Sequence, residues 1–201
     1  DTDIMTPHDA LIANLDALPA TVRNAVAAHA EWIRSNGKGG KQLVLRGDNP
    51  ARAMLAGLDL SACDLSGADL GGADLTHTDL TQAKRTLPKL PGAGLYGCKL
   101  RGAALAGANL GNVLAKGANL AAANLTAIEV LTAAGARTGR YLPANLQGAN
   151  FEGSDFRGAD LRGARLDHTI LRGANMAAAD LRNSSWENAI LEGASLIGSR
   201  R

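Results

Sequence analysis

The sequence predicts an all-β solenoid: a four-sided parallel β-helix that carries an N-terminal α-helical cap. Two observations lead to this fold class. Large apolar residues recur every five positions over most of the chain, and a small residue usually stands two positions before each of them. A period of five suits neither an α-helix, which repeats every 3.6 residues, nor a flat strand, which repeats every two. It suits a chain that turns a corner every five residues, so that four units close one coil.

The central apolar residue of each unit is expected to point into the coil. These centres run in steps of five, with few gaps, from Leu55 to Val130, and after a shift of one residue from Leu146 to Leu196. The small residue also points inward, because the interior of such a coil is narrow. Asp or Asn often precedes the centre, where its side chain can bond nearby backbone, and Gly often follows two residues later, where it relieves strain at the corner.

The unit Ala-Asp/Asn-Leu-X-Gly closely resembles the repeat of the pentapeptide repeat family, and the resemblance covers most of the chain. It implies a right-handed quadrilateral parallel β-helix. Its coils would stack by backbone hydrogen bonds at the usual strand spacing, about 4.8 Å.

Two segments are expected. Residues 1–42 form a helical cap and a joint, and residues 43–201 form the β-helix. The cap contains two helical stretches, of which the second begins at Pro19 and ends with Gly37 as its cap.

An uncovered β-helix end exposes unpaired backbone groups, so we expect these helices to cover the first coil. The alternative is a separate recognition helix. The apolar residues that could face the first coil are Val22, Val26, Trp32 and Ile33.

The repeat first breaks near residues 81–94. The register would place Arg85 at an inward centre, and a lone buried charge costs several kcal/mol. We therefore expect a bulge or loop there. Such a loop is either a projecting contact that exposes Lys84 and Arg85, or a tolerated insertion.

The second break lies near residues 131–143, where the shift of one residue in the leucine phase requires an insertion. We expect it to expose Arg137, Arg140 and Tyr141. Tyrosine flanked by arginine is a common anchor at protein interfaces. The alternative is a plain surface loop.

Charge is unevenly distributed although the net charge is only +2. Residues 55–82 hold five aspartates and no Lys or Arg, whereas residues 157–182 hold five arginines, among them Arg162 and Arg182. This pattern indicates either a polarised docking surface or the solvated faces of a rod.

Catalysis, a cofactor and a bound metal are not expected. The four histidines are scattered, and no nucleophile stands beside a base. Cys63 and Cys98 occupy small inward positions on different faces, which predicts buried thiols rather than a disulfide. No signal peptide or run of about 18 apolar residues is visible, so we expect no membrane span and a cytoplasmic location.

The function that these features favour is a non-catalytic, macromolecule-binding scaffold whose partner is a protein. The alternative is implied by the family resemblance: some pentapeptide repeat proteins mimic DNA, occupy DNA gyrase and confer resistance to its poisons. From residue 51 onward, however, the chain has 16 basic and 13 acidic residues, whereas a DNA mimic should be strongly acidic. Direct nucleic-acid binding is not expected, because stacking aromatic residues are scarce.

The final coil is expected to self-associate end to end about a two-fold axis. It carries apolar side chains at a coil end for which we see no helical cover, and open backbone edges with apolar side chains favour pairing. These residues are Trp186, Leu191, Leu196 and Ile197.

Overall fold

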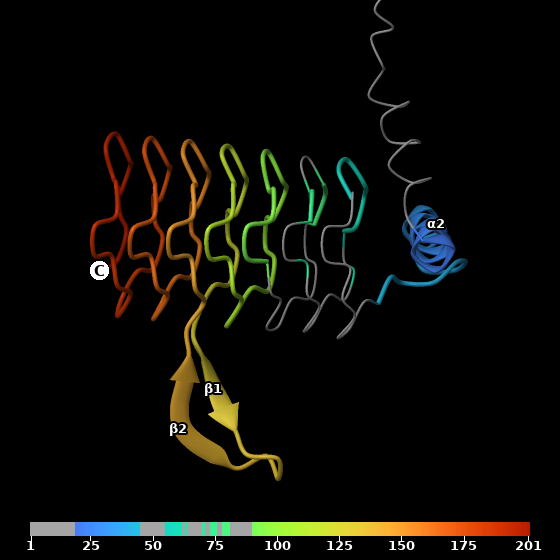
Figure 1. Ribbon diagram of the computed structural model, residues 1–201, viewed down its shortest axis with the longest axis horizontal. Coiled ribbons are helices and arrows are strands. Elements are labelled where there is room, and N and C mark those ends of the chain that lie inside the picture. Colours follow the sequence, from blue (N-terminus) through green and yellow to red (C-terminus); the bar gives the residue numbers. More distant parts are fainter. Residues whose placement is uncertain are drawn as a thin grey trace, which may run out of the picture.

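The computed structural model describes residues 19–44, 55–61, 63, 70, 73–75, 78–80 and 90–201. These residues contain helix α2 (Ala20–Arg34) and strands β1 (Ile128–Leu131) and β2 (Arg137–Leu142). Most of the other described residues wind into stacked coils that form a rod. Helix α2 lies across one end of the rod, and the hairpin β1–β2 leaves its side (Figure 1). The first helical stretch expected from the sequence lies outside the described residues.

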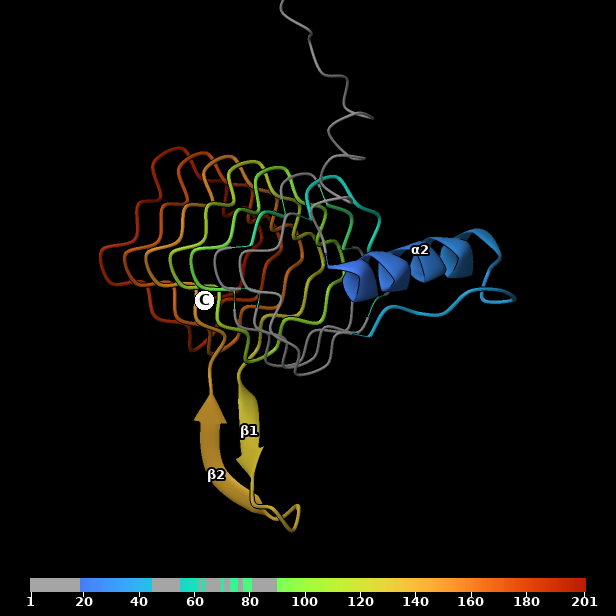
Figure 2. The same cartoon turned by 45° about the vertical axis from the view of Figure 1, so that its right-hand side comes forward.

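Parallel backbone bridges join each coil to the next, and their partners are 20 residues apart. Lys99, for example, pairs with Asn119. In that bridge the Leu100 amide donates to the Asn119 carbonyl at 2.7 Å, and the Asn119 amide donates to the Cys98 carbonyl at 2.9 Å. Twenty residues hold four five-residue units, so one coil contains four units. Figure 2 shows how closely the coils repeat one another along the rod.

The two inward positions of the unit are buried, as the repeat predicts. Central side chains such as Leu100 and small ones such as Ala108 have no exposed surface. Phe151 and Phe156 occupy successive centres, with their rings edge to face and 5.0 Å between centroids. The interior is therefore mainly a column of leucine, phenylalanine and alanine, and the hydroxyls of the buried Thr78, Ser154 and Thr169 donate to backbone carbonyls.

Each corner places one residue in the left-handed backbone region, two positions after the centre. Glycine fills most corners because it has no Cβ to clash there. Asn112 and Ala122 fill two others, with φ values of 56° and 55°. The Asn before the centre closes the turn, since the Asn119 Oδ1 accepts the Ala121 amide at 3.0 Å. Both predicted roles of the polar and glycine positions are thus confirmed.

The second break is an insertion that leaves the coils on either side in register. The bridge partners across it, such as Asn109 and Asn145, are 36 residues apart instead of 20, which is 16 residues more. The chain leaves the rod after Ala127 and returns at Ala144. The prediction that Val130 is an inward centre is wrong, because it lies on β1 and is 37 % exposed.

The first break lies mostly outside the described residues, which include neither Lys84 nor Arg85. The bridges that flank it, Asp74 to Gly94 and Asp79 to Lys99, keep the 20-residue separation. The chain therefore takes the same number of residues for this coil as for its neighbours.

Helix α2 begins after Pro19, as predicted, but the residue that ends it differs from the prediction. Asn36, with φ 53°, is the first left-handed residue after the helix, and Gly37 follows it with φ 81°. The Asn36 amide donates to the Ile33 carbonyl at 3.1 Å, and the Gly37 amide donates to the Trp32 carbonyl at 2.8 Å. These bonds form a Schellman motif, in which asparagine can take the place of glycine because it tolerates this conformation.

One side of α2 packs against the apolar core at the end of the rod. Val26 is buried there, and Val22 is half-buried against the same cluster. Trp32 and Ile33 are half-buried. His29, which the sequence presented only as one of four scattered histidines, is completely buried. Polar and apolar contacts therefore together attach the helix to the rod.

Candidate protein-binding surface

The hairpin projects away from the rod as a two-stranded ribbon (Figure 1). Its strands are antiparallel, with Glu129 opposite Tyr141 and Val130 opposite Arg140. The connecting loop turns at Gly135, whose φ is +80°. The sequence predicted where this insertion lies but not its structure, which is a β-hairpin.

A bulge near the loop reshapes strand β2. The register shifts between Val130 and Leu131, which leaves Thr138 and Gly139 as extra residues on β2. The Thr138 hydroxyl donates to the Val130 carbonyl. The Gly139 amide donates to Glu129 Oε1 at 3.3 Å. Bulges bend a strand and re-aim its side chains, so this one sets the direction of the arginines beside it.

Every residue from 130 to 142 is exposed. Tyr141 shows 63 % of its surface and Leu131 shows 53 %, while Val130 and Leu142 are also exposed. Opposite residues share a face of the ribbon, so apolar side chains occur on both faces. An isolated two-stranded hairpin is only marginally stable in water. A ribbon of this kind gains stability when a partner covers it.

The two arginines of β2 differ in their electrostatic surroundings. Arg137 Nη1 lies 3.6 Å from Glu129 Oε2 across the hairpin. Arg140 forms no ion pair with any residue that the structure describes. Among the described residues the guanidinium of Arg140 is therefore unpaired, and it lies on the face of the ribbon opposite to that of Tyr141, because successive strand residues alternate between faces.

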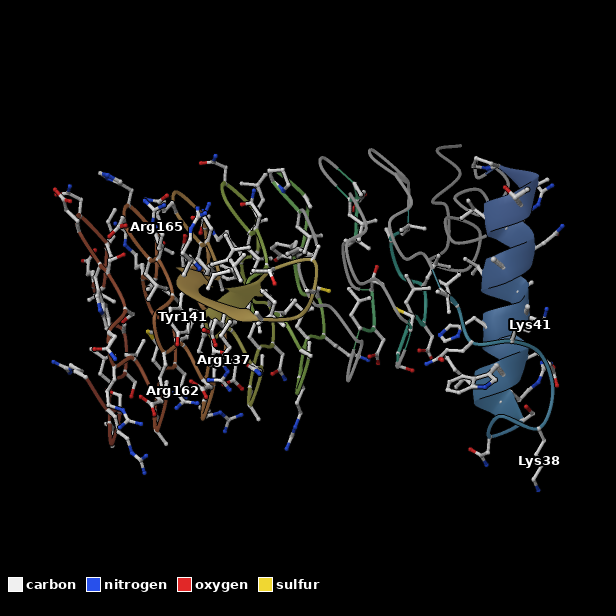
Figure 3. All side chains as sticks on the ribbon, turned by 90° about the horizontal axis from the view of Figure 1, so that it is seen from below. Lys38, Lys41, Arg137, Tyr141, Arg162 and Arg165 are labelled. Atoms are coloured by element: carbon white, nitrogen blue, oxygen red, sulfur yellow. The ribbon has the colours of Figure 1, made fainter. Side chains whose placement is uncertain are left out.

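Two further arginines stand at the stem of the hairpin. The Ala127 amide, where the chain leaves the rod, donates to the Arg162 carbonyl at 3.1 Å, and the Arg165 amide donates to the Ala144 carbonyl at 2.9 Å, where the chain returns. Arg162 lies on the coil stacked against the departing strand and Arg165 on the coil stacked against the returning one. Figure 3 shows both near the hairpin. We call Arg137, Arg140, Tyr141, Arg162 and Arg165 the hairpin surface. Arg165 was not predicted as a site residue, and its position one full coil after Asn145 gives no signal in the sequence.

Several arginines on the coils are paired with an aspartate two residues earlier. Arg162 donates through Nε to Asp160 Oδ1 at 2.8 Å and through Nη2 to Oδ2 at 2.6 Å. Arg182 holds Asp180 in the same way, at 2.9 and 2.6 Å. The same aspartates accept the backbone amide of the arginine. These arginines therefore brace the corners of the rod, and Arg140 is the better candidate for a partner contact.

These pairs predict a loss of stability in acid. Hydrogen bonds from Arg182 lower the pKa of Asp180 from its usual 3.8 to about 2. A carboxyl group whose pKa is lower in the folded state stabilises the protein fully above its unfolded pKa, and this contribution disappears as pH falls through the folded pKa. We expect the melting temperature to fall between about pH 4 and pH 2, and Asp180→Asn to remove part of that fall. Superimposable melting profiles for the two proteins over this range would contradict the assignment.

Other kinds of site are not seen among the described residues. No three His, Cys, Asp or Glu side chains there are placed to hold a metal ion. Cys63 and Cys98 are buried and form no disulfide. In the same part of the chain, no helix is both long and apolar enough to cross a membrane.

A family model of pentapeptide repeats matches the chain in eight copies, over residues 51–84, 93–127, 144–173 and 174–200. These matches cover more than half of the chain. The chain belongs to the pentapeptide repeat family. The unmatched residues of this pentapeptide repeat protein between 127 and 144 are those of the hairpin, so the hairpin is an addition to the repeat.

Solved pentapeptide repeat proteins from different organisms are similar to it. HetL, involved in heterocyst differentiation regulation in the cyanobacterium Nostoc sp. strain PCC 7120, is 24 % identical over 84 % of this chain and 96 % of its own, with a TM-score of 0.32. A protein of the Arabidopsis thaliana thylakoid lumen is 31 % identical over 59 % of this chain and 71 % of its own, with a TM-score of 0.36. QnrB1, a plasmid-mediated fluoroquinolone resistance protein, is 15 % identical over 80 % of this chain and 86 % of its own, with a TM-score of 0.39. No curated protein matches the sequence significantly.

The last coil of this pentapeptide repeat protein is less well covered than the others. Trp186, Leu191 and Leu196 continue the inward ladders but are only half-buried. Ile197 points outward and is 79 % exposed. Self-association through these residues stays a prediction.

Proposed function

We propose that this chain is a non-catalytic scaffold that binds another protein, and that the hairpin surface is its docking site. One observation carries the proposal: residues 130–142 stand off the rod and are all exposed. Both ends of the hairpin are anchored to the rod by backbone bonds, at Ala127 and at Ala144. Solenoids commonly present binding elements in this way.

The composition of the hairpin supports a protein partner. Tyr141 and Arg140 belong to the residue types that contribute most to binding energy at protein interfaces. Exposed apolar residues accompany them, with Val130 and Leu142 on the face of Arg140. Exposed apolar groups that lie together on a surface commonly mark interaction sites. The arginines favour a partner with acidic groups at the rim of its contact surface.

The inward positions support a non-catalytic role for the rod. They hold mainly leucine and alanine, with two buried thiols. On the outside, Asp160 and Asp180 form ion pairs with arginines. We further propose that the coils wind in the right-handed sense of the family. Residues 1–42 would act as cap and joint, and residues 43–201 as the rod.

The hairpin can be removed cleanly, which gives a direct test. Deleting residues 128–143 joins Ala127 to Ala144 and restores the 20-residue separation between Asn109 and Asn145. We expect this variant to fold as an uninterrupted rod with unchanged α2. In affinity capture from the source cell, the wild-type protein should retain a partner that the deletion variant loses. A deletion variant that folds and captures the same proteins as wild type would refute the proposal.

Single substitutions then locate the contact, with the captured partner purified. Tyr141→Ala should raise the Kd about 30-fold, the effect of an anchor residue that contributes about 2 kcal/mol. Arg140→Ala should act in the same direction. Tyr96→Ala is the matched control, because Tyr96 is similarly exposed but lies on a coil far from the hairpin in the sequence. Equal losses for Tyr96 and Tyr141 would show that the hairpin is not the docking site.

The wild-type protein and the deletion variant also test the alternative function, gyrase protection. If gyrase is the partner, the wild-type protein should preserve DNA supercoiling in the presence of a quinolone, and the deletion variant should not. We rank this second because arginines pair with Asp155, Asp160 and Asp180, which reduces the negative charge that DNA mimicry needs.

A further inference from the structure

His29 joins three parts of the protein at the capped end of the rod. It lies on α2 and has no exposed surface. Its Nδ1 accepts the amide of Leu43, in the segment that returns from the helix to the coils, at 3.0 Å. Its Nε2 lies 3.0 Å from the carbonyl oxygen of Ser61, on a coil. One ring therefore connects the helix, the return segment and the rod.

These partners require a neutral ring with one particular proton. The backbone amide of Leu43 can only donate, so Nδ1 must be unprotonated to accept from it. The Ser61 carbonyl can only accept, so Nε2 must carry the hydrogen. A second proton on Nδ1 would face the Leu43 N–H and break that bond. It would also place a positive charge in a completely buried site.

The surroundings of His29 shift its pKa in opposite directions, and burial has the largest effect. It lowers the pKa of His29, while the Ser61 carbonyl and the charge of Asp59 raise it. On α2, Glu31 and Arg34 pair with each other. On the return segment, Lys38 and Lys41 are exposed to solvent. Thus no acidic side chain other than Asp59, among the described groups that act on this ring, favours the charged form.

The helix and the coils are held by different kinds of contact. Along the rod, each described coil is joined to the next by repeated backbone bonds at successive corners. Between α2 and the rest of the described chain, the attachments include the two bonds of His29, one from the Lys41 amide to the Ala28 carbonyl at 3.0 Å, and apolar contacts around Val26. Loss of the His29 bonds therefore affects the helix before it affects the rod.

We propose that His29 is an acid-sensitive latch, whose protonation releases α2 from the end of the solenoid while the coils stay folded. Release uncovers the apolar end of the rod around Leu43, Leu55 and Leu58. The protein would then expose a new surface in mildly acidic surroundings and cover it again at neutral pH.

Hydrogen exchange tests the latch in the full chain. At pH 7.5 the amides of residues 20–34 should be protected. Near pH 5, after correction for the intrinsic exchange rate, their protection should be lost progressively, because protonation of His29 favours the released helix. Protection of residues 144–181 should not change. An NMR titration of the His29 ring should show protonation over the same pH range as the loss of protection.

Two variants separate the latch from general acid sensitivity. His29→Gln cannot titrate, so its helix should show the same protection at both pH values. His168→Asn is the control, because His168 is exposed at a left-handed corner where asparagine occurs in other coils. It should behave as wild type. If His29→Gln fails to dock the helix, the wild-type titration decides alone. The proposal is overturned if His29 becomes protonated while α2 stays protected, or if helix and rod lose protection together.

Discussion

Replacing Leu110 with aspartate is expected to lower the free energy of unfolding by more than about 4 kcal/mol, the range of exceptionally damaging substitutions. Leu110 is an inward centre with no exposed surface, and its neighbours in the core are apolar. A carboxylate there would lose its hydration without gaining a hydrogen-bond donor. Protonation would avoid the charge but would still leave a polar group unsatisfied. Chemical denaturation followed by circular dichroism measures the effect.

The matched control is the same substitution four residues later. Leu114 occupies the outward position of the next unit and is 62 % exposed. Leu114→Asp should change the free energy of unfolding by no more than about 0.5 kcal/mol, as is usual at surface positions. Similar losses in the two variants would show that the inward and outward positions are assigned wrongly.

Replacing Gly40 with alanine is the second large effect that we expect, and it should appear at the cap. Gly40 has a φ of +69°, and a Cβ added to it would lie 2.2 Å from the Ala28 carbonyl oxygen and 2.6 Å from the Trp32 amide nitrogen. Both are backbone atoms of α2, so no side chain can move aside to make room. The return segment must separate from the helix, which breaks the nearby bond from Lys41 to Ala28. Forced overpacking of this kind costs about 1 to 3 kcal/mol, in addition to the strain of the left-handed conformation.

Gly92→Ala isolates the contribution of the backbone conformation. Its φ is +67°, but a Cβ there would meet nothing within 4 Å. We expect it to cost only about 1 to 2 kcal/mol, the penalty for alanine in the left-handed region. Amide exchange should show α2 unprotected in the Gly40 variant and protected in the Gly92 variant. A protected α2 in both would mean that the return segment does not pack closely against the helix.

The register of the rod was predictable because a single geometric rule is repeated many times. Each unit must present a large and a small apolar residue inward, so Leu100 and Ala108 could be placed without any tertiary information. The rule cannot tell when a unit leaves the rod. Val130 has the right spacing and an apolar side chain, yet it belongs to β1. Both environments accept valine, because β-branched residues suit any strand.

The docking features depend on contacts between segments that are distant in sequence. His29 finds its partners 14 and 32 residues away, and nothing in the helical pattern marks it. By contrast, the pairing of Arg162 with Asp160 is local, because the corner geometry brings together the residues before and after a centre. The sequence showed a cluster of arginines there. Only the structure shows that Arg162 and Arg182 pair with an aspartate at a corner of the rod, whereas Arg140 pairs with no described aspartate or glutamate.

The hairpin shows that an insertion outside the coils does not change the number of residues in each coil. A segment of 16 residues leaves after Ala127 and returns at Ala144, and the bridges beyond it resume with a separation of 20. A graft moved by one full coil would emerge from the same side of the rod about 4.8 Å away, which is one strand spacing. A graft moved by a single unit would emerge from the neighbouring side. The height and direction of an attached element are therefore set by counting residues, which makes this rod a molecular ruler on which binding elements can be placed.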